Sequence, residues 1–156
     1  VYHAHGGFVI GSEFSGGMKN IVVRKNTFQG TDAGLRFKSA VKRGGKSENI
    51  YIDHIYMTDI TGDAITFETT YFDNHVGAKQ QAAPVKQEFL PDFQDIHISN
   101  VYVRGCKNGI VAHGAEGMIH DITIKDCNIF YNKNAKDIDA ACKITLENVN
   151  FSTFAK

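Results

Sequence analysis

One pattern of hydrophobic positions recurs five times along the chain. Each copy places apolar side chains at relative positions 0, 2, 5 and 7, with Asn26 as the one polar exception. An apolar residue at every second position, interrupted by a slip of one residue, predicts a short strand, a tight corner and a second short strand, each with one inward face. Position 0 of the copies falls on Ile21, Ile50, Ile96, Ile122 and Ile144.

A third alternating segment follows in the first three copies, at residues 34–38, 64–68 and 109–113. The copies begin 29, 46, 26 and 22 residues apart, and no convincing amphipathic helix separates them. Short strands in repeats of this kind are typical of a β-solenoid, in which every coil buries its inward side chains against the neighbouring coils. We therefore predict an all-β chain, a parallel β-helix of about five to six coils.

A β-sandwich built from hairpins is the alternative, because it also has short strands at regular spacing. A sandwich need not repeat the same core offsets, and Asn108-Gly109 leads into a third segment instead of joining two paired strands. The solenoid is therefore the favoured fold, with residues 1–156 as a single β-helix unit. The longest spacing contains an insertion at about residues 69–93, with both prolines, which we expect to project from one corner.

The composition argues against several classes of partner. The chain has 17 Lys and Arg against 17 Asp and Glu, so it lacks the basic field that nucleic-acid binding requires. Its apolar runs are only a few residues long, far short of the roughly 20 that cross a bilayer. We expect neither a nucleic-acid nor a membrane partner. The three cysteines form no C-x-x-C pair, which argues against a disulfide framework or a zinc site, and Cys127 at a core position is expected to be buried.

Two segments carry candidate chemistry. His5 is followed by two glycines, which allow the backbone or a ligand to approach the imidazole closely. In the segment 34–38, alternation places Arg36 and Lys38 on one face of a strand, opposite Leu35 and Phe37. Such a pair suits an anionic ligand, because arginine grips a carboxylate through two hydrogen bonds and lysine adds a mobile charge. Arg36 follows His5 by 31 residues, about one coil, so we expect the two on neighbouring coils of one face.

These segments resemble those of glycoside hydrolase family 28, the polygalacturonases and their relatives. Residues 4–13 and 34–39 correspond to the family's Gly-His-Gly and Arg-Ile-Lys segments, with Ala4 and Phe37 as departures, and residues 64–71 to a strand that ends in a cleft tyrosine. The resemblance implies a right-handed β-helix and the hydrolysis of α-1,4-galacturonan (pectin) with inversion. The residues to which it assigns roles are His5 as the active-site histidine, Arg36 and Lys38 as the pair that binds the uronate carboxylate, and Tyr71 as the cleft tyrosine.

The acids that the family uses for hydrolysis do not occur in this chain. They lie in an Asn-Thr-Asp segment and an Asp-Asp pair that precede the histidine motif, and neither is present. Inversion requires one acid and one base about 6.5 to 9.5 Å apart. The nearest carboxylates, Asp32, Asp53, Asp63 and Asp73, belong to neither motif, and we expect no catalytic role for them. We interpret the chain as the C-terminal portion of a longer catalytic domain, truncated at its N-terminal end, and expect the isolated chain to be inactive.

The resemblance also implies partners and location. We expect an anionic, galacturonan-type polysaccharide as substrate, no cofactor, and a secreted or periplasmic protein. His3 and His5 lack the further ligands of a metal site, so no metal is expected. An exposed first coil would present unpaired strand edges and favour self-association. Two alternatives stay open: a non-catalytic solenoid that binds acidic polysaccharide, and a structural solenoid without a ligand.

Overall fold

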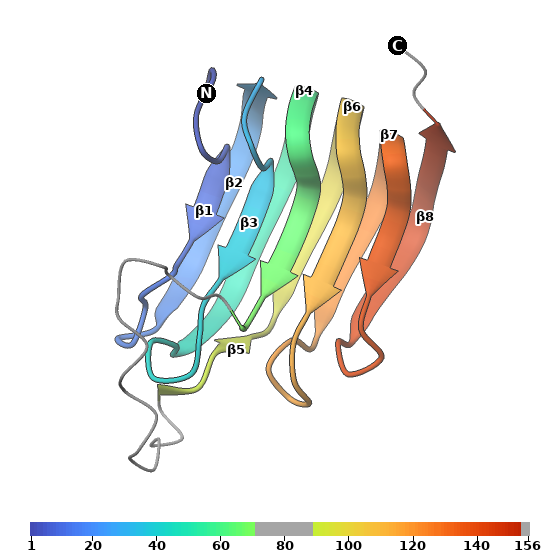
Figure 1. Ribbon diagram of the computed structural model, residues 1–156. Coiled ribbons are helices and arrows are strands. Elements are labelled where there is room, and N and C mark those ends of the chain that lie inside the picture. The colour runs from blue at the N-terminus through green and yellow to red at the C-terminus, as the bar shows by residue number, and fades with distance from the viewer. Residues whose placement is uncertain (71–88, 154–156) are drawn as a thin grey trace.

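The computed structural model describes residues 1–70 and 89–153, which form a stack of parallel strands (Figure 1). No α-helix occurs in these two ranges. Nothing in them has both the length and the hydropathy of a membrane-spanning helix. The strands are β1 (Phe8–Ile10), β2 (Met18–Gln29), β3 (Leu35–Lys38), β4 (Lys46–Glu68), β5 (Asp92–Phe93), β6 (Ile96–His113), β7 (Ile122–Ile138) and β8 (Ile144–Thr153).

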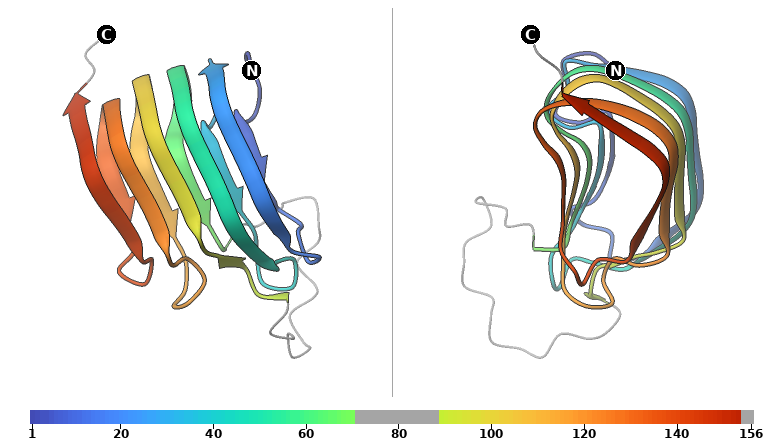
Figure 2. Two further views of the ribbon diagram at one scale, coloured as in Figure 1. Left: turned by 180° about the vertical axis from the view of Figure 1, so that it is seen from behind. Right: turned by 90° about the vertical axis from the view of Figure 1, so that its right-hand side faces the viewer.

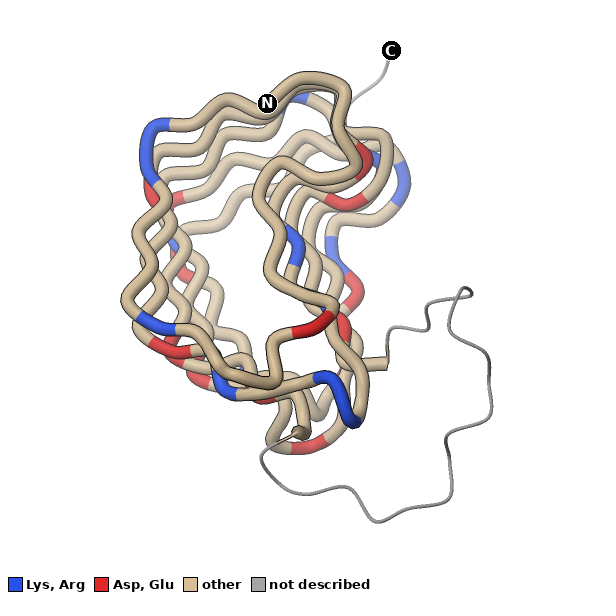
Figure 3. The backbone as a smooth tube through the Cα atoms, turned by 90° about the vertical axis from the view of Figure 1, so that its left-hand side faces the viewer, with Lys and Arg blue, Asp and Glu red and all other residues tan. Residues whose placement is uncertain are grey.

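The strands join in one sheet that winds around a common core. The order along the sheet is β1-β3-β4-β6-β7-β8, and β2 and β5 also pair with β4. Each of these pairs is parallel, and equivalent residues of successive copies lie side by side: Ile50 opposite Ile96, Ile96 opposite Ile122, and Ile122 opposite Ile144. Viewed along the stack, the coils superpose (Figure 2, right, and Figure 3). The predicted parallel β-helix is therefore confirmed, and the β-sandwich alternative is wrong.

Each coil turns at residues in the left-handed conformation. The residue before position 0 has a φ of 61° at Asn20, 57° at Asn49, 52° at Asp95 and 51° at Asp121. A single left-handed residue bends a strand, and Asn and Asp tolerate this conformation better than most residues with a Cβ. The Asn and Asp residues of the repeat therefore mark corners. A left-handed residue at position 4 also causes the one-residue break in the hydrophobic alternation. The φ angle there is 51° to 55°, at Lys25, His54, Asn100, Asp126 and Asn148.

The core runs through the whole stack and is most completely buried in the middle. In the three inner copies, the residues at positions 0, 2, 5 and 7 are at most 2% exposed. Most of those in the first and last copies are half-buried, because, among the described residues, β8 pairs with a neighbouring coil on one side only and β2 is paired on its outer side only at Gln29, with Tyr2. Asn26 is exposed, and its Nδ2 donates to the carbonyl oxygen of Arg24 at 2.8 Å. Cys127 is buried as predicted, and burial raises the pKa of its thiol to about 11.

The third segments form one wall of the β-helix. β3 pairs with β1 on one side and with residues 65–68 of β4 on the other, and that part of β4 pairs with residues 110–113 of β6. The structure adds a further member, because Ile110 pairs with Lys136 near the end of β7. The residues there are mostly polar, so hydrophobic alternation did not predict this segment.

Most of the predicted insertion lies outside the described residues, which omit 71–88. Its last residues, Asp92 and Phe93, form β5 beside the start of β4. Phe93 is fully buried, and its ring centroid lies 5.1 Å from that of Phe14 and 6.0 Å from that of Phe37. The chain therefore contributes a side chain to the core before the next copy begins at Ile96.

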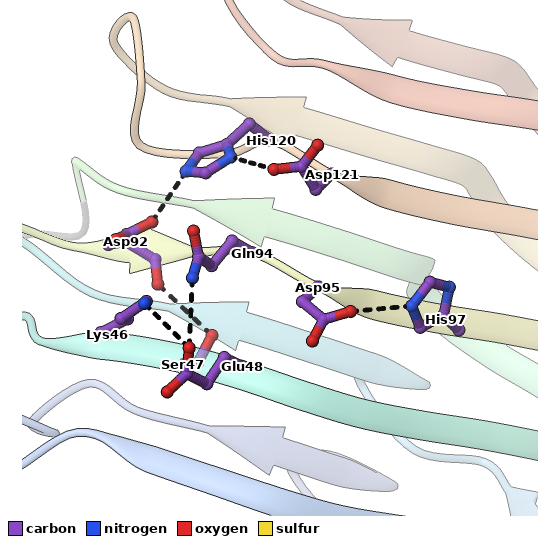
Figure 4. A network of polar contacts seen from close by, with 9 residues as sticks. All are labelled: Lys46, Ser47, Glu48, Asp92, Gln94, Asp95, His97, His120 and Asp121. Carbon is purple, nitrogen blue, oxygen red and sulfur yellow. Dashed lines mark hydrogen bonds and ion pairs between the residues drawn. The ribbon is translucent and has the colours of Figure 1, made fainter.

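His120 links β5 to the residue before β7 (Figure 4). Its Nε2 lies 3.0 Å from Oδ1 of Asp92, and its Nδ1 lies 2.7 Å from Oδ2 of Asp121. Burial alone would lower the pKa of His120, but the hydrogen bond to Asp121 and the charge of Asp92 outweigh burial, so the pKa is raised above its usual value. A protonated imidazole donates to both carboxylates at once, whereas a neutral imidazole donates to only one.

These contacts predict that stability falls as the pH rises through the pKa of folded His120. Because the folded pKa lies above the unfolded value of about 6.5, the contribution is complete below about pH 6.5 and is lost at higher pH. We expect the free energy of unfolding, measured by urea titration, to decline as the pH rises above about 6.5. The decline should be smaller in His120→Gln. Equal declines in the two proteins would show that these contacts contribute nothing.

Candidate functional site

Arg36 and Lys38 project from the wall of third segments. In β3, Leu35 and Phe37 are completely buried, and they alternate with half-buried Arg36 and Lys38. The alternation arises because successive side chains of a strand point to opposite faces of the sheet. The structure thus places Arg36 and Lys38 on the same outer face, two residues apart.

His5 reaches Arg36 from the preceding coil. Its Nε2 lies 3.1 Å from Nη1 of Arg36, although 31 residues separate the two in sequence. On the opposite side of the ring, Nδ1 lies 2.7 Å from Oδ2 of Asp32. The structure therefore brings together the histidine and the arginine that the sequence singled out, and it adds a carboxylate to them.

The glycines after His5 permit this close packing. A Cβ on Gly7 would lie 2.3 Å from the ring of Phe28 and 2.8 Å from the carbonyl oxygen of Gly34, so a larger residue would force the coils apart. The backbone N–H of Phe8 donates to that same carbonyl at 3.0 Å. Main-chain pairing thus holds His5 one coil before β3.

Comparison with known proteins identifies the family of the chain. Residues 2–153 match the model of Glycosyl hydrolases family 28. The chain belongs to this family. The match covers all three of the described segments that carry His5, Asp32 and Arg36.

Three curated proteins have similar sequences. A polygalacturonase of Ralstonia nicotianae is 27% identical over 150 residues, which cover 90% of this chain and 26% of the relative. A polygalacturonase of Ralstonia solanacearum is 33% identical over 113 residues, which cover 70% and 19% respectively. An exo-poly-alpha-D-galacturonosidase of Dickeya chrysanthemi is 29% identical over 102 residues, covering 65% and 16%. The family 28 chain thus spans about a quarter of these relatives or less.

Asp32 is the part of this candidate site for which the sequence predicted no role. Its Oδ1 accepts a hydrogen bond from Oγ1 of Thr61 at 3.3 Å, while Oδ2 faces His5. Its backbone N–H donates to the carbonyl oxygen of Ala4 at 3.0 Å, which places it beside His5 on the next coil. The only signal of this contact in the sequence is the spacing of about one coil between His5 and Asp32. An Asp before Ala33 and Gly34 is otherwise typical of a turn.

The other carboxylates considered from the sequence lie elsewhere. Asp53 occupies a corner, where hydrogen bonds, above all one from Nδ2 of Asn100 at 2.8 Å, hold its pKa well below the usual range. Asp63 accepts a hydrogen bond from Nδ2 of Asn108 at 2.8 Å. Both therefore join neighbouring coils. Asp73 falls outside the described residues.

The face that carries Lys38 becomes acidic toward β7. Lys38 lies opposite Glu68 of β4, and Glu68 lies opposite His113 of β6. The ring of His113 lies between two carboxylates, with Nε2 3.4 Å from Asp137 and Nδ1 3.2 Å from Asp139. An anionic ligand is therefore attracted to the β3 end of this wall and repelled from the β7 end.

Two further predictions concern Tyr71 and metals. Tyr71, the predicted cleft tyrosine, lies outside the described residues. In residues 1–70 and 89–153, no group of three or more His, Cys, Asp or Glu side chains is placed to hold a metal ion. The chemistry available at the described site is that of His5, Asp32 and the two cations.

A separate groove of about 450 Å³ runs over the first segments of the coils. Tyr51 and His97 line it, and their rings stack with centroids 5.0 Å apart and an interplanar angle of 21°. Each ring covers one face of the other, so the pair stabilises the stacking of β4 on β6. Neither His5 nor Arg36 lines this groove.

Proposed function

We propose that this chain is part of a polygalacturonase-type glycosidase that hydrolyses α-1,4-linked galacturonan, the backbone of pectin, with inversion. The observation that carries the proposal is the contact between His5 and Arg36, with Lys38 on the same face. Membership of family 28 and the names of the relatives support it.

In this proposal, Arg36 and Lys38 bind the carboxylate of one galacturonate unit. The planar guanidinium matches a carboxylate with two parallel hydrogen bonds, and the ammonium adds a point charge. Both side chains are half-buried, so salt screens their attraction for the ligand less than it would at a fully exposed site. His5 lies beside this subsite and orients or tunes a catalytic acid, and Tyr71 shapes the sugar subsite.

Inverting hydrolysis also needs an acid and a base, which we propose belong to other parts of the complete enzyme. Asp32 is engaged by His5 and Thr61, and Asp53 and Asp63 bind across coils. We therefore expect the 156-residue chain alone to bind galacturonan fragments weakly and to release no galacturonate. Because the substrate is an extracellular polymer, we place the enzyme in the periplasm or outside the cell.

A non-catalytic solenoid that binds acidic polysaccharide is the second candidate. It is favoured by one observation: the described carboxylate closest to His5, Asp32, already has hydrogen-bond partners at both oxygens. In this case Arg36 and Lys38 keep their role, and no step of hydrolysis takes place.

The test is to incubate the enzyme that contains this chain with polygalacturonate and to follow the products by proton NMR. We expect the new reducing ends to appear first as the β anomer, because inversion converts an α linkage into a β hemiacetal. Fully methyl-esterified pectin is the matched control and should react poorly, because its carboxylates are neutral. Binding without products would support the second candidate, and neither binding nor products would refute both.

A further inference from the structure

We infer that Asp32 is a positioning residue, which holds His5 as a neutral imidazole with its proton on Nδ1 and the lone pair of Nε2 toward Arg36. The geometric part of this inference is independent of the proposed function. Its consequence for turnover rests on that function.

His5 contacts Arg36 through one of its ring nitrogens. The guanidinium of arginine has only donors, and it stays charged in proteins. At 3.1 Å from Nη1 of Arg36, Nε2 of His5 must therefore act as the acceptor. A ring nitrogen that accepts a hydrogen bond carries no proton, so the proton of the neutral ring is on Nδ1.

The contact between His5 and Asp32 fixes this proton. Nδ1 of His5 lies 2.7 Å from Oδ2 of Asp32, so the Nδ1–H donates to a carboxylate oxygen. A hydrogen bond to an ionised acceptor is stronger than one between neutral groups. Because both side chains are more than half exposed, their contact depends on how firmly the carboxylate itself is held.

Both neighbouring coils hold Asp32 in place. Its N–H donates to the carbonyl oxygen of Ala4 at 3.0 Å, and its Oδ1 accepts from Oγ1 of Thr61 at 3.3 Å. Gly62 allows this approach, because a Cβ there would lie 2.5 Å from the carbonyl oxygen of Asp32. Three successive coils thus determine the orientation of the imidazole, much as a third group orients the base in other catalytic sites.

The arrangement couples His5 to the ligand. When Arg36 turns its guanidinium to a uronate carboxylate, it withdraws a donor from Nε2, and that nitrogen becomes available to accept a hydrogen bond from the catalytic acid. Asp32, which stays on Nδ1, keeps the ring in place during this exchange. A misplacement of the ring of about 1 Å is enough to cost about a hundredfold in rate.

The direct test is the tautomer of His5, read from the ¹⁵N shifts of its ring in the 156-residue chain at a pH where the ring is neutral. We expect the Nδ1–H form in the wild type and in Asp32→Asn, because the amide oxygen of Asn can accept the same hydrogen bond while its NH₂ faces Thr61. We expect Asp32→Ala to lose this preference. Thermal unfolding of each variant verifies that it is folded.

The kinetic test uses the complete enzyme and polygalacturonate. Asp32→Ala should lower kcat by about tenfold to a hundredfold and leave KM within about twofold, because Arg36 and Lys38 still bind the carboxylate. Asp32→Asn should restore most of kcat. An Nε2–H tautomer in the wild type, or equal losses in the two variants, would overturn the inference. The expected tautomer without any turnover of galacturonan would instead refute the proposed function.

Discussion

Replacing Arg36 with Ala is expected to lower kcat/KM for polygalacturonate by about thirtyfold to several thousandfold. Truncating one partner of a hydrogen-bonded charge pair costs roughly 2 to 5 kcal/mol, and each 1.4 kcal/mol is tenfold. The loss should appear mainly in KM, because the carboxylate is bound in the ground state as well as in the transition state. Initial rates at several substrate concentrations measure both constants.

Two further variants separate charge from geometry. Arg36→Lys keeps the charge but loses the fork of donors, so it should recover only part of the activity. Arg104→Ala removes an exposed arginine from β6, in the second segment of its coil, and should leave both constants unchanged. A normal KM in Arg36→Ala, or equal losses in Arg36→Ala and Arg104→Ala, would show that Arg36 does not bind the substrate.

The fold was predictable because its main determinant is local. Alternation at positions 0, 2, 5 and 7 describes the inward face of each strand, and it held in the inner copies, where Ile50, Ile96 and Ile122 are almost completely buried. The corners carry a signal too, since Asn20 and Asp95 adopt the left-handed conformation that such residues favour. Periodicity did not reveal β5, because Phe93 lies at the end of an insertion with no repeat of its own.

The site was predictable only in part, because it is assembled across coils. The 31 residues between His5 and Arg36 correspond to about one coil, so their proximity followed from the repeat. The role of Asp32 depends on which single residues of neighbouring coils lie opposite each other. This register varies where the spacing between copies varies. A carboxylate two residues before a glycine is common in turns, so its pairing with His5 became apparent only from the structure.

The second large effect is expected in the core, where Phe67→Ala should lower the free energy of unfolding by about 4 kcal/mol. Phe67 is fully buried, and its ring stacks on that of Phe37 with centroids 4.4 Å apart and planes 6° from parallel. It also contacts the ring of Phe93 edge-on at 6.3 Å. Removing it leaves a cavity between three coils that the rigid strands cannot close. Urea unfolding monitored by circular dichroism measures the loss.

Matched variants make this result interpretable. Phe67→Leu keeps much of the volume and should cost only about 1 to 2 kcal/mol, so it gives a value even if Phe67→Ala does not fold. Tyr102→Ala removes an aromatic ring from the outer face, where Tyr102 is 41% exposed, and should cost less than Phe67→Ala. A loss in Phe67→Ala no larger than that in Tyr102→Ala would contradict the stacked core. Phe37 lies between Arg36 and Lys38 in β3, so a cavity beside Phe37 should also loosen the cationic pair. Phe67→Leu is therefore expected to raise KM for polygalacturonate. The tautomer of His5 should stay unchanged.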